Sequence, residues 1–208
     1  MAKILVVDDH PVVLNGTKDI LEQLDNVRVD IQSNPRLVIK SVQMEQYDVC
    51  ILDVNMKEID GVTLAKNIRK IKPTIKIVLY TGYNLYDFYE LLLNNEIDGL
   101  LSKESTKEKI LHTISAVLRS ESILPLDFIE YVRKEASIAV NSGHNQLSTQ
   151  QLRILEYVSE GYTNKAISFE LKVTQRTVEN HLTRIFTILN VGSRLEAVLK
   201  AKELKLIK

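Results

Sequence analysis

The chain has one cysteine, no tryptophan, four prolines and seven glycines in 208 residues. A single cysteine excludes an intrachain disulfide framework, and Cys50 lies in an apolar run (residues 49–52) where a buried, inert thiol is expected. No stretch approaches the roughly 18 apolar residues of a membrane span. The first residues hold only a short apolar run before Asp8 and Asp9, so a secretory signal is not expected. We therefore expect a cytoplasmic protein without direct membrane association.

An excess of charge of either sign is also missing, since 27 Lys and Arg balance 27 Asp and Glu. With 45% hydrophobic and 26% charged residues, the composition is that of a globular protein and excludes a disordered or collagen-like chain. The balance hides an asymmetry, because residues 1–120 and 121–146 each have a net charge of −2, whereas residues 147–208 have +4. A basic C-terminal segment indicates contact with a polyanion, and an ordinary solvated surface fits this charge equally well.

Short apolar runs alternate with helix-period segments over the first 120 residues. The apolar runs predict strands at residues 4–7, 27–31, 49–52, 77–80 and 99–101. The periodic segments predict helices at residues 11–24, 35–46, 61–71, 85–94 and 107–119. Continuous apolar strands joined by helices indicate a parallel sheet covered on both faces, with the strand order 2-1-3-4-5. The expected fold class is α/β, a five-stranded doubly wound parallel sheet of the flavodoxin-like type.

The rest of the chain is predicted to be helical. One helix is expected near residues 125–135, inside a linker whose polar end (residues 141–146) has no period. Four further helices are predicted near residues 148–160, 164–171, 175–189 and 193–203. The expected domains are therefore an α/β domain over 1–120, a linker over 121–146, and a small all-α domain over 147–208.

Carboxylates follow two of the predicted buried strands at the point where each strand ends. Asp8 and Asp9 follow the first strand, and Asp53 follows the third. In a doubly wound sheet these ends meet at the topological switch point, where ligands bind. Close carboxylates repel one another unless they share a cation, and Mg²⁺ takes a few carboxylates, often a backbone carbonyl and several waters. We therefore predict a Mg²⁺ site, although a cap of the first helix is a competing role for one Asp.

Thr81 and Lys103 end the fourth and fifth predicted strands at the same edge of the sheet. A hydroxyl and an ammonium placed there are suited to hold a phosphoryl group on Asp53, because a carboxylate can act as the nucleophile of phosphoryl transfer. Mg²⁺ and Lys103 would then offset the charge of the transition state. Taken singly, Thr81 is equally well explained as a helix cap and Lys103 as a surface residue, so the prediction depends on the whole set.

Residues 163–189 have the spacing of a helix-turn-helix. A helix over residues 164–171 is followed by a turn at Lys172 and Val173, and a second helix opens at Thr174, whose hydroxyl can cap it. The predicted packing positions are Ile167, Leu171, Val178, Leu182, Ile185 and Leu189. The exposed face of the second helix carries polar side chains suited to base edges and phosphates, namely Gln175, Arg176, Glu179, Asn180, Thr183 and Arg184. A helical bundle with an ordinary polar surface is the competing interpretation.

The acidic set resembles a known family over residues 2–120. Asp8-Asp9, Asp53, Thr81 and Lys103, with Met56 and Asp60-Gly61, are similar to the receiver domain of bacterial two-component response regulators. The resemblance implies that a sensor histidine kinase phosphorylates Asp53. It also implies that Asp8, Asp9, Asp53 and the backbone carbonyl of Asn55 bind Mg²⁺, and that Thr81 and Lys103 contact the phosphoryl group. Two departures are Leu100, where many receivers have a switch aromatic, and Glu104, where many have proline.

The C-terminal segment, residues 147–208, resembles the LuxR-type helix-turn-helix of NarL/FixJ response regulators. The similarity is carried by residues 161–167, 177–182, 185–186, 189–191 and 193–197. It implies base contacts from Glu179, Asn180 and Thr183. It implies phosphate contacts from Thr163, Asn164, Lys165, Arg176 and Arg184, and a dimer surface on the final helix. Two residues depart from the family pattern: Glu179 stands where many relatives have lysine, and Gln151 stands where many have glutamate. Together with other short motifs, Glu179 resembles the branch of the family that serves quorum sensing and competence.

The combined interpretation is a response regulator transcription factor. Phosphorylation of Asp53 by a sensor histidine kinase, with Mg²⁺ bound, is expected to favour a homodimer that binds an inverted repeat in double-stranded promoter DNA. One alternative is the same fold regulated by a protein partner without phosphorylation. Another is a Mg²⁺-dependent phosphatase, which would need a second Asp at the position of Asn55. We expect no enzyme activity beyond self-phosphorylation and self-dephosphorylation at Asp53.

Overall fold

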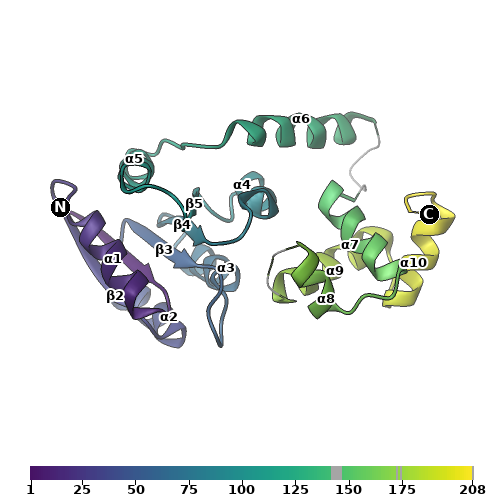
Figure 1. Cartoon of the computed structure of the whole chain (residues 1–208), viewed down its shortest axis with the longest axis horizontal. Helices are drawn as coiled ribbons and strands as arrows, with labels where there is room; N and C mark the ends of the chain where they lie inside the picture. Colours follow the sequence, from purple (N-terminus) through teal and green to yellow (C-terminus); the bar gives the residue numbers. More distant parts are fainter. Residues whose placement is uncertain (142–146, 172, 174, 208) are drawn as a thin grey trace. The chain divides into compact units, whose positions relative to one another are not determined.

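The computed structural model describes residues 1–141, 147–171, 173 and 175–207. Two compact units, Met1–Pro125 and Leu126–Lys208, make up the chain (Figure 1). Among the described residues, no helix combines the length and the apolar character needed to cross a membrane.

The first unit contains a five-stranded parallel sheet with the order β2-β1-β3-β4-β5. Its strands are β1 (Ala2–Val7), β2 (Val27–Gln32), β3 (Val49–Asp53), β4 (Lys76–Thr81) and β5 (Gly99–Ser102). The central strand β3 is buried along its whole length, whereas in the edge strand β2 only Val29 is buried (3% exposed) and Ile31, on the same face, is 39% exposed. The α/β prediction and the predicted strand order are both confirmed.

Helices cover both faces of this sheet. They are α1 (Pro11–Leu21), α2 (Pro35–Met44), α3 (Gly61–Ile71), α4 (Tyr89–Leu93) and α5 (Lys107–Leu118). Successive side chains of a strand point to opposite faces, so each face has its own core. On one face, Val6 and Ile51 pack with Leu14 of α1 and Ile114 of α5. On the other face, α2 and α3 contact each other and the strands that precede them.

The predicted helix over residues 11–24 is wrong at its C-terminal end. α1 ends at Leu21, and the N–H of Leu24 donates to the carbonyl of Leu21 in a turn (3.0 Å). Asn26 then adopts a left-handed φ of 58°, a conformation that asparagine tolerates. Leu24 nevertheless packs against the core, which explains why it shares the apolar stripe of the helix.

The single helix predicted over residues 85–94 is also wrong, because a 3₁₀ turn (η1, Leu85–Phe88) precedes α4. The side-chain oxygen of Asn84 accepts from the N–H of Tyr86 (3.1 Å), and its carbonyl accepts from the N–H of Asp87 (3.2 Å). The second bond closes an i→i+3 ring, which sets a 3₁₀ rather than an α-helical start.

The second unit is entirely helical in its described residues. Its helices are α6 (Leu126–Asn141), α7 (Thr149–Ser159), α8 (Asn164–Leu171), α9 (Gln175–Leu189) and α10 (Arg194–Glu203). The predicted end of α6 at residue 135 is wrong, because neither proline nor glycine interrupts the chain between Leu126 and Asn141. Of the polar segment predicted at 141–146, Asn141 lies in α6 and residues 142–146 lie outside the described residues. The domain limits at 120/121 and 146/147 stay predictions.

One hydrophobic cluster joins α7, α8, α9 and α10. All six predicted packing positions of the helix-turn-helix are buried in it. α7 begins with a capping box, in which Ser148 Oγ accepts from the N–H of Gln151 (3.3 Å) and Gln151 Oε1 accepts from the N–H of Ser148 (2.9 Å). The buried Gln151 therefore caps α7, and its neutral amide costs less free energy to bury than a charged carboxylate would.

Candidate functional site

The carboxyl ends of β1 and β3 bring three carboxylates together. Asp8 and Asp53 are 1% and 2% exposed, and the side chain of Asp9 is 13% exposed. Ligand atoms of these three residues and of His10 all lie within 4.8 Å of one another. The chain continues from β1 to β2 on one side of the sheet and from β3 to β4 and β5 on the other, so this cluster lies at the topological switch point.

Lys103 bridges two of these carboxylates. Its Nζ lies 2.6 Å from Asp8 Oδ2 and 3.0 Å from Asp53 Oδ1. Burial raises the pKa of Asp53, the hydrogen bond from Lys103 lowers it, and the charge of Asp8 raises it, with a net shift above its ordinary value. Burial alone would lower the pKa of Lys103, but its hydrogen bonds to Asp8 and Asp53 raise that pKa, so the ammonium stays charged.

Two carboxylate oxygens of the cluster lack a hydrogen-bond partner. Asp53 Oδ2 and Asp9 Oδ1 are buried, and neither has a hydrogen bond within the described part of the chain. A buried charged oxygen costs free energy unless it is paired. The loop after β3, which carries Asn55, lies against the cluster because the N–H of Lys57 donates to Asp9 Oδ2 (3.1 Å). A group of carboxylate oxygens with two unsatisfied members fits a hard divalent cation such as Mg²⁺.

Thr81 ends β4 with a fully buried side chain. Its Oγ1 accepts from the N–H of Tyr83 (3.0 Å), and its carbonyl accepts from the N–H of Lys103 (2.7 Å). The hydroxyl is the acceptor in the first bond, so its own proton is left to be donated. The second bond ties the end of β4 to the residue that carries the ammonium.

Helix α3 begins directly against the phosphoacceptor candidate. Asp60 caps it, because Asp60 Oδ1 accepts from the N–H of Thr63 (2.9 Å). A Cβ on Gly61 would lie 2.1 Å from the carbonyl oxygen of Asp53 and 3.1 Å from the Cα of Val54. A side chain at position 61 would therefore displace the backbone that carries Asp53.

The Lys103→Met variant tests the electrostatics of the cluster. Removing one member of a buried ion pair costs about 3–5 kcal/mol. Because Lys103 is 24% exposed and the carboxyls can take up a proton, we expect a loss on the order of 2 kcal/mol in unfolding free energy at neutral pH. Without the ammonium, the already raised pKa of Asp53 rises further above 3.8, so the native state binds more protons than the unfolded state.

The deficit of Lys103→Met should therefore grow as the pH rises above 3.8 and shrink as it falls through the raised pKa. Urea unfolding followed by circular dichroism, at neutral and at mildly acidic pH, measures this. Lys40→Met on the exposed surface of α2 is the control. A deficit that is equal at both pH values would contradict the assigned interaction.

The helix-turn-helix begins with two residues that serve α8 itself. Thr163 Oγ1 accepts from the N–H of Ala166 (3.2 Å), which caps the helix. Asn164 Oδ1 accepts from the guanidinium of Arg194 (2.9 Å), which also donates to the carbonyl of Tyr162. Lys165 is exposed. Of these predicted phosphate contacts, Thr163 and Asn164 thus also have structural roles, and Lys165 presents its charge to solvent.

The predicted recognition face lies on α9. Gln175 and Thr183 are exposed, whereas Glu179, Asn180 and Arg184 are half-buried. Gln175 Nε2 donates to Glu179 Oε1 (3.0 Å), and the Thr183 hydroxyl donates to the Glu179 carbonyl (3.0 Å). Lys172, Thr174 and the side chain of Arg176 lie outside the described residues. The bond from Gln175 thus holds the Glu179 carboxylate along the predicted recognition face of α9.

The Arg194→Ala variant tests the link between α8 and α10. The change removes two charge-assisted hydrogen bonds across 30 residues of sequence, each worth about 1.5–3 kcal/mol. Because the guanidinium is only half-buried and water can replace part of both bonds, we expect a net loss of about 2 kcal/mol in unfolding free energy, measured by urea unfolding, and weaker DNA binding because α8 loses its anchor. In a double-mutant cycle, Asn164→Ala and Arg194→Ala should be non-additive. Strict additivity would show that the contact contributes nothing.

Comparisons with known proteins cover both units. The response regulator receiver domain matches residues 4–115, and the LuxR family of bacterial regulatory proteins matches residues 145–201. The chain belongs to the response regulator family. This response regulator is 39% identical to the transcriptional regulatory protein ComA of Bacillus subtilis (strain 168), over 97% of this chain and 98% of ComA. It is 30% identical to the oxygen regulatory protein NreC of Staphylococcus carnosus (strain TM300), over 99% of both chains.

The family comparisons confirm the predicted class of protein. The branch expected from the sequence is the one that contains ComA, and the match to ComA agrees with that expectation. Solved structures agree on the fold: the RcsB–DNA complex superposes with a TM-score of 0.61 at 21% identity, over 100% of this chain and 99% of that chain. The response regulator therefore combines a receiver fold with a LuxR-type DNA-binding domain, and it is a transcription regulator rather than a typical enzyme.

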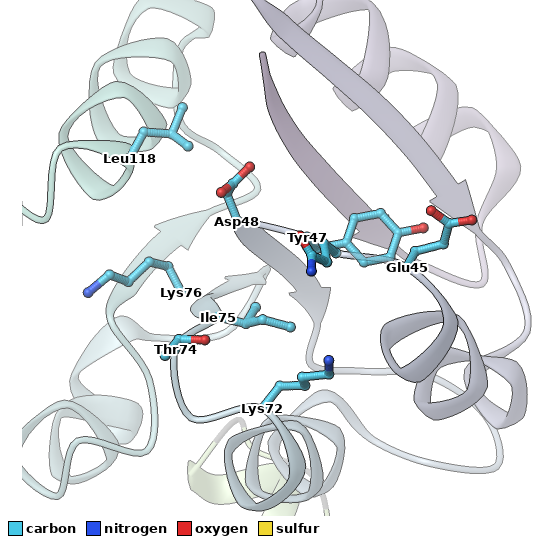
Figure 2. A pocket seen from close by; sticks show the side chains of 9 residues that line it. Glu45, Tyr47, Asp48, Lys72, Thr74, Ile75, Lys76 and Leu118 are labelled. Atoms are coloured by element: carbon cyan, nitrogen blue, oxygen red, sulfur yellow. The ribbon is translucent and has the colours of Figure 1, made fainter.

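A pocket of about 420 Å³ lies at the opposite, amino-terminal end of β3 and β4 (Figure 2). Lysines and carboxylates both line it, including Lys72, Lys76, Glu45 and Asp48. Glu45 pairs with Lys3 Nζ (2.9 Å), and Asp48 Oδ2 accepts from the N–H of Lys3 (2.7 Å). These paired charges of both signs indicate no single class of ligand.

His10 is a residue of the acidic site that the sequence pattern does not single out as a ligand. Its Nδ1 lies 3.1 Å from Asp8 Oδ1 and 2.9 Å from Asp9 Oδ1. In the sequence, no other histidine stands at a spacing from His10 that is typical of metal ligands. The groups that could bind a metal together with His10 are carboxylates instead. The signal that identified Asp8 and Asp9, a position just past the end of a buried strand, applies equally to His10.

Proposed function

We propose that a sensor histidine kinase phosphorylates this regulator on Asp53, and that the phosphorylated homodimer binds an inverted repeat in double-stranded promoter DNA. The receiver would span residues 1–120, the linker 121–146 and the DNA-binding domain 147–208. The observation that carries the proposal is Asp53, a buried carboxylate with one unpartnered oxygen, adjacent to Asp8, Asp9 and the ammonium of Lys103. The proposed location is the cytoplasm, and the similarity to ComA supports a role in quorum sensing.

In the proposed transfer, a carboxylate oxygen of Asp53 attacks the phosphorus, and the bond from phosphorus to the donor nitrogen breaks. The electron pair of that bond stays with the donor. Asp8, Asp9, Asp53 and the carbonyl of Asn55 would hold Mg²⁺, which offsets the charge of the phosphoryl oxygens when it is bound. Lys103 supplies a second positive charge, and the Thr81 hydroxyl has a proton to donate to a phosphoryl oxygen.

In the proposed switch, the phosphoryl group on Asp53 competes with the present hydrogen-bond partners of Lys103 and Thr81. An acyl phosphate on Asp53 would carry about −1.5 to −2 charge in place of the single negative charge of the carboxylate, so it draws the ammonium away from Asp8 and the hydroxyl toward Asp53. Thr81 and Lys103 are joined through their backbones, and the Thr81 hydroxyl also holds the N–H of Tyr83. Movement of either residue therefore shifts the loops after β4 and β5. Those loops are the element through which phosphorylation would bias dimerisation.

Two copies of the DNA-binding domain are needed because each has a net charge of only +4. Tethering two weak sites raises the overall affinity through the effective concentration of the second site. α10 offers a dimer surface, since its apolar residues Leu195 and Leu199 are 69% and 59% exposed and lie one turn apart. Base contacts would come from Glu179, Asn180 and Thr183. Phosphate contacts would come from Thr163, Asn164, Lys165, Arg176 and Arg184, and Gln175 would be a further DNA-facing residue.

Intact mass spectrometry after incubation with acetyl phosphate and Mg²⁺ tests the phosphorylation site. We expect one added phosphoryl group in the native protein and none in Asp53→Ala. Asp9→Asn should slow the reaction without abolishing the acceptor, because it weakens the cation site alone. An adduct that persists in Asp53→Ala would contradict the assignment. A native protein that accepts no phosphate from either the small donor or a kinase would instead favour regulation by a protein partner.

A further inference from the structure

His10 is held against the acidic cluster by its own backbone. Its N–H donates to Asp8 Oδ1 (2.8 Å), and Pro11 follows it as the first residue of α1. Pro11 restricts the backbone of His10, and the ring itself is held by contacts of Nδ1 to Asp8 Oδ1 (3.1 Å) and Asp9 Oδ1 (2.9 Å). The side chain makes no capping bond to α1, so the needs of the helix do not explain its position.

The ligand atoms of the cluster nearly match the span of one coordinated ion. Two ligands of a six-coordinate ion, each about 2.1 Å from it, lie at most about 4.2 Å apart. The ligand atoms of Asp8, Asp9, Asp53 and His10 lie within 4.8 Å of one another, so contraction by a few tenths of an ångström would place them around one ion. The buried, unpartnered Asp53 Oδ2 is an independent sign that a cation completes the cluster.

We propose that His10 Nδ1 is a ligand of this cation, and that the site therefore selects divalent transition metals such as Mn²⁺ and Zn²⁺ over Mg²⁺. This inference rests on the cation site of the proposed function. Oxygen-only sites suit Mg²⁺, whereas an imidazole nitrogen adds affinity for first-row transition metals and almost none for Mg²⁺. With its proton on Nε2, the ring offers the Nδ1 lone pair to the ion. The side chain is 61% exposed, so Nε2–H can bind water and the ion can enter from solvent.

Pulsed electron paramagnetic resonance of Mn²⁺ bound to the full chain tests this ligand directly. A coordinated imidazole gives nitrogen modulation of the Mn²⁺ echo, which carboxylates and water do not give. We expect the modulation in the native protein and in His112→Gln, an exposed histidine of α5 outside the cluster. We expect it to disappear in His10→Gln. His10 caps no helix, and a glutamine side chain can still donate to Asp8 or Asp9, so the thermal midpoint of His10→Gln should stay close to that of the native protein.

Calorimetric titration gives the selectivity. His10→Gln should weaken Mn²⁺ and Zn²⁺ binding about tenfold or more, and should leave Mg²⁺ binding within about twofold. Bound Mn²⁺ without nitrogen modulation, or equal losses for Mn²⁺ and Mg²⁺, would overturn the role of His10 and leave the proposed cation site standing. Cation binding that survives both Asp9→Asn and Asp53→Ala unchanged would instead overturn the cation site itself.

Discussion

We expect Gly61→Ala to lower the unfolding free energy by about 2–3 kcal/mol and to impair phosphorylation of Asp53. The added Cβ would lie 2.1 Å from the carbonyl oxygen of Asp53 and 2.9 Å from its carbonyl carbon. Both atoms belong to the backbone of a fully buried strand, so they cannot yield as a flexible side chain would. Relief of the clash must move α3 or the end of β3, and movement of the strand end displaces Asp53 from Lys103.

Two other glycines serve as matched controls for this variant. A Cβ on Gly82 or on Gly16 meets no atom within 4 Å, and neither residue has a left-handed φ. Gly82→Ala should be nearly neutral, and Gly16→Ala, in the middle of α1, should stabilise by about 0.5–1 kcal/mol. Urea unfolding and the mass assay together measure stability and phosphate acceptance. Native stability and native phosphate uptake in Gly61→Ala would show that the close approach has no consequence.

The second large effect concerns DNA binding, where Lys165→Ala and Asn180→Ala should behave differently. Lys165 is an exposed cation at the start of α8, so its removal should weaken binding to every sequence by roughly tenfold per dimer and reduce the salt slope by about two. Asn180 lies on the recognition face of α9, so its removal should cost about 1–3 kcal/mol per half-site on the preferred sequence only. Fluorescence anisotropy on specific and random DNA over a range of salt separates the two outcomes.

Loss of specificity in Lys165→Ala, or a uniform loss in Asn180→Ala, would reverse the assigned roles. Phe169→Ala is the control, because this exposed residue of α8 is neither charged nor among the proposed DNA contacts. It should leave both affinity and salt dependence unchanged.

The strands and the acidic cluster could be predicted because both depend on local pattern. Runs such as residues 4–7 and 49–52 are apolar without interruption, which only a doubly covered parallel sheet explains. Since parallel strands end at one edge, the residues that follow them must converge there, as Asp8 and Asp53 do. The apolar period likewise identified the buried positions of α9.

The remaining features depend on interactions that local pattern does not encode. The early end of α1 is marked by the turn bond from Leu24 to Leu21, and the 3₁₀ turn η1 by bonds accepted by both the side chain and the carbonyl of Asn84. The bond of Asn164 to Arg194 joins residues 30 apart, so a residue read as a phosphate contact is also an anchor of α8. The bridging position of Lys103 arises only when β5 is placed beside β4. None of these features could be predicted from the sequence pattern, because each depends on contacts that exist only in the folded chain.

The most direct test of the switch is DNA affinity measured on one sample in two phosphorylation states. An operator would first be selected from random DNA with protein treated with acetyl phosphate and Mg²⁺. Fluorescence anisotropy with that operator should then show binding tightened about tenfold or more by phosphorylation of the native protein, with intact mass confirming the adduct. Asp53→Ala should bind weakly under both conditions. Equal affinity of the phosphorylated and unphosphorylated native protein, or an equal response in Asp53→Ala, would contradict control of DNA binding by Asp53.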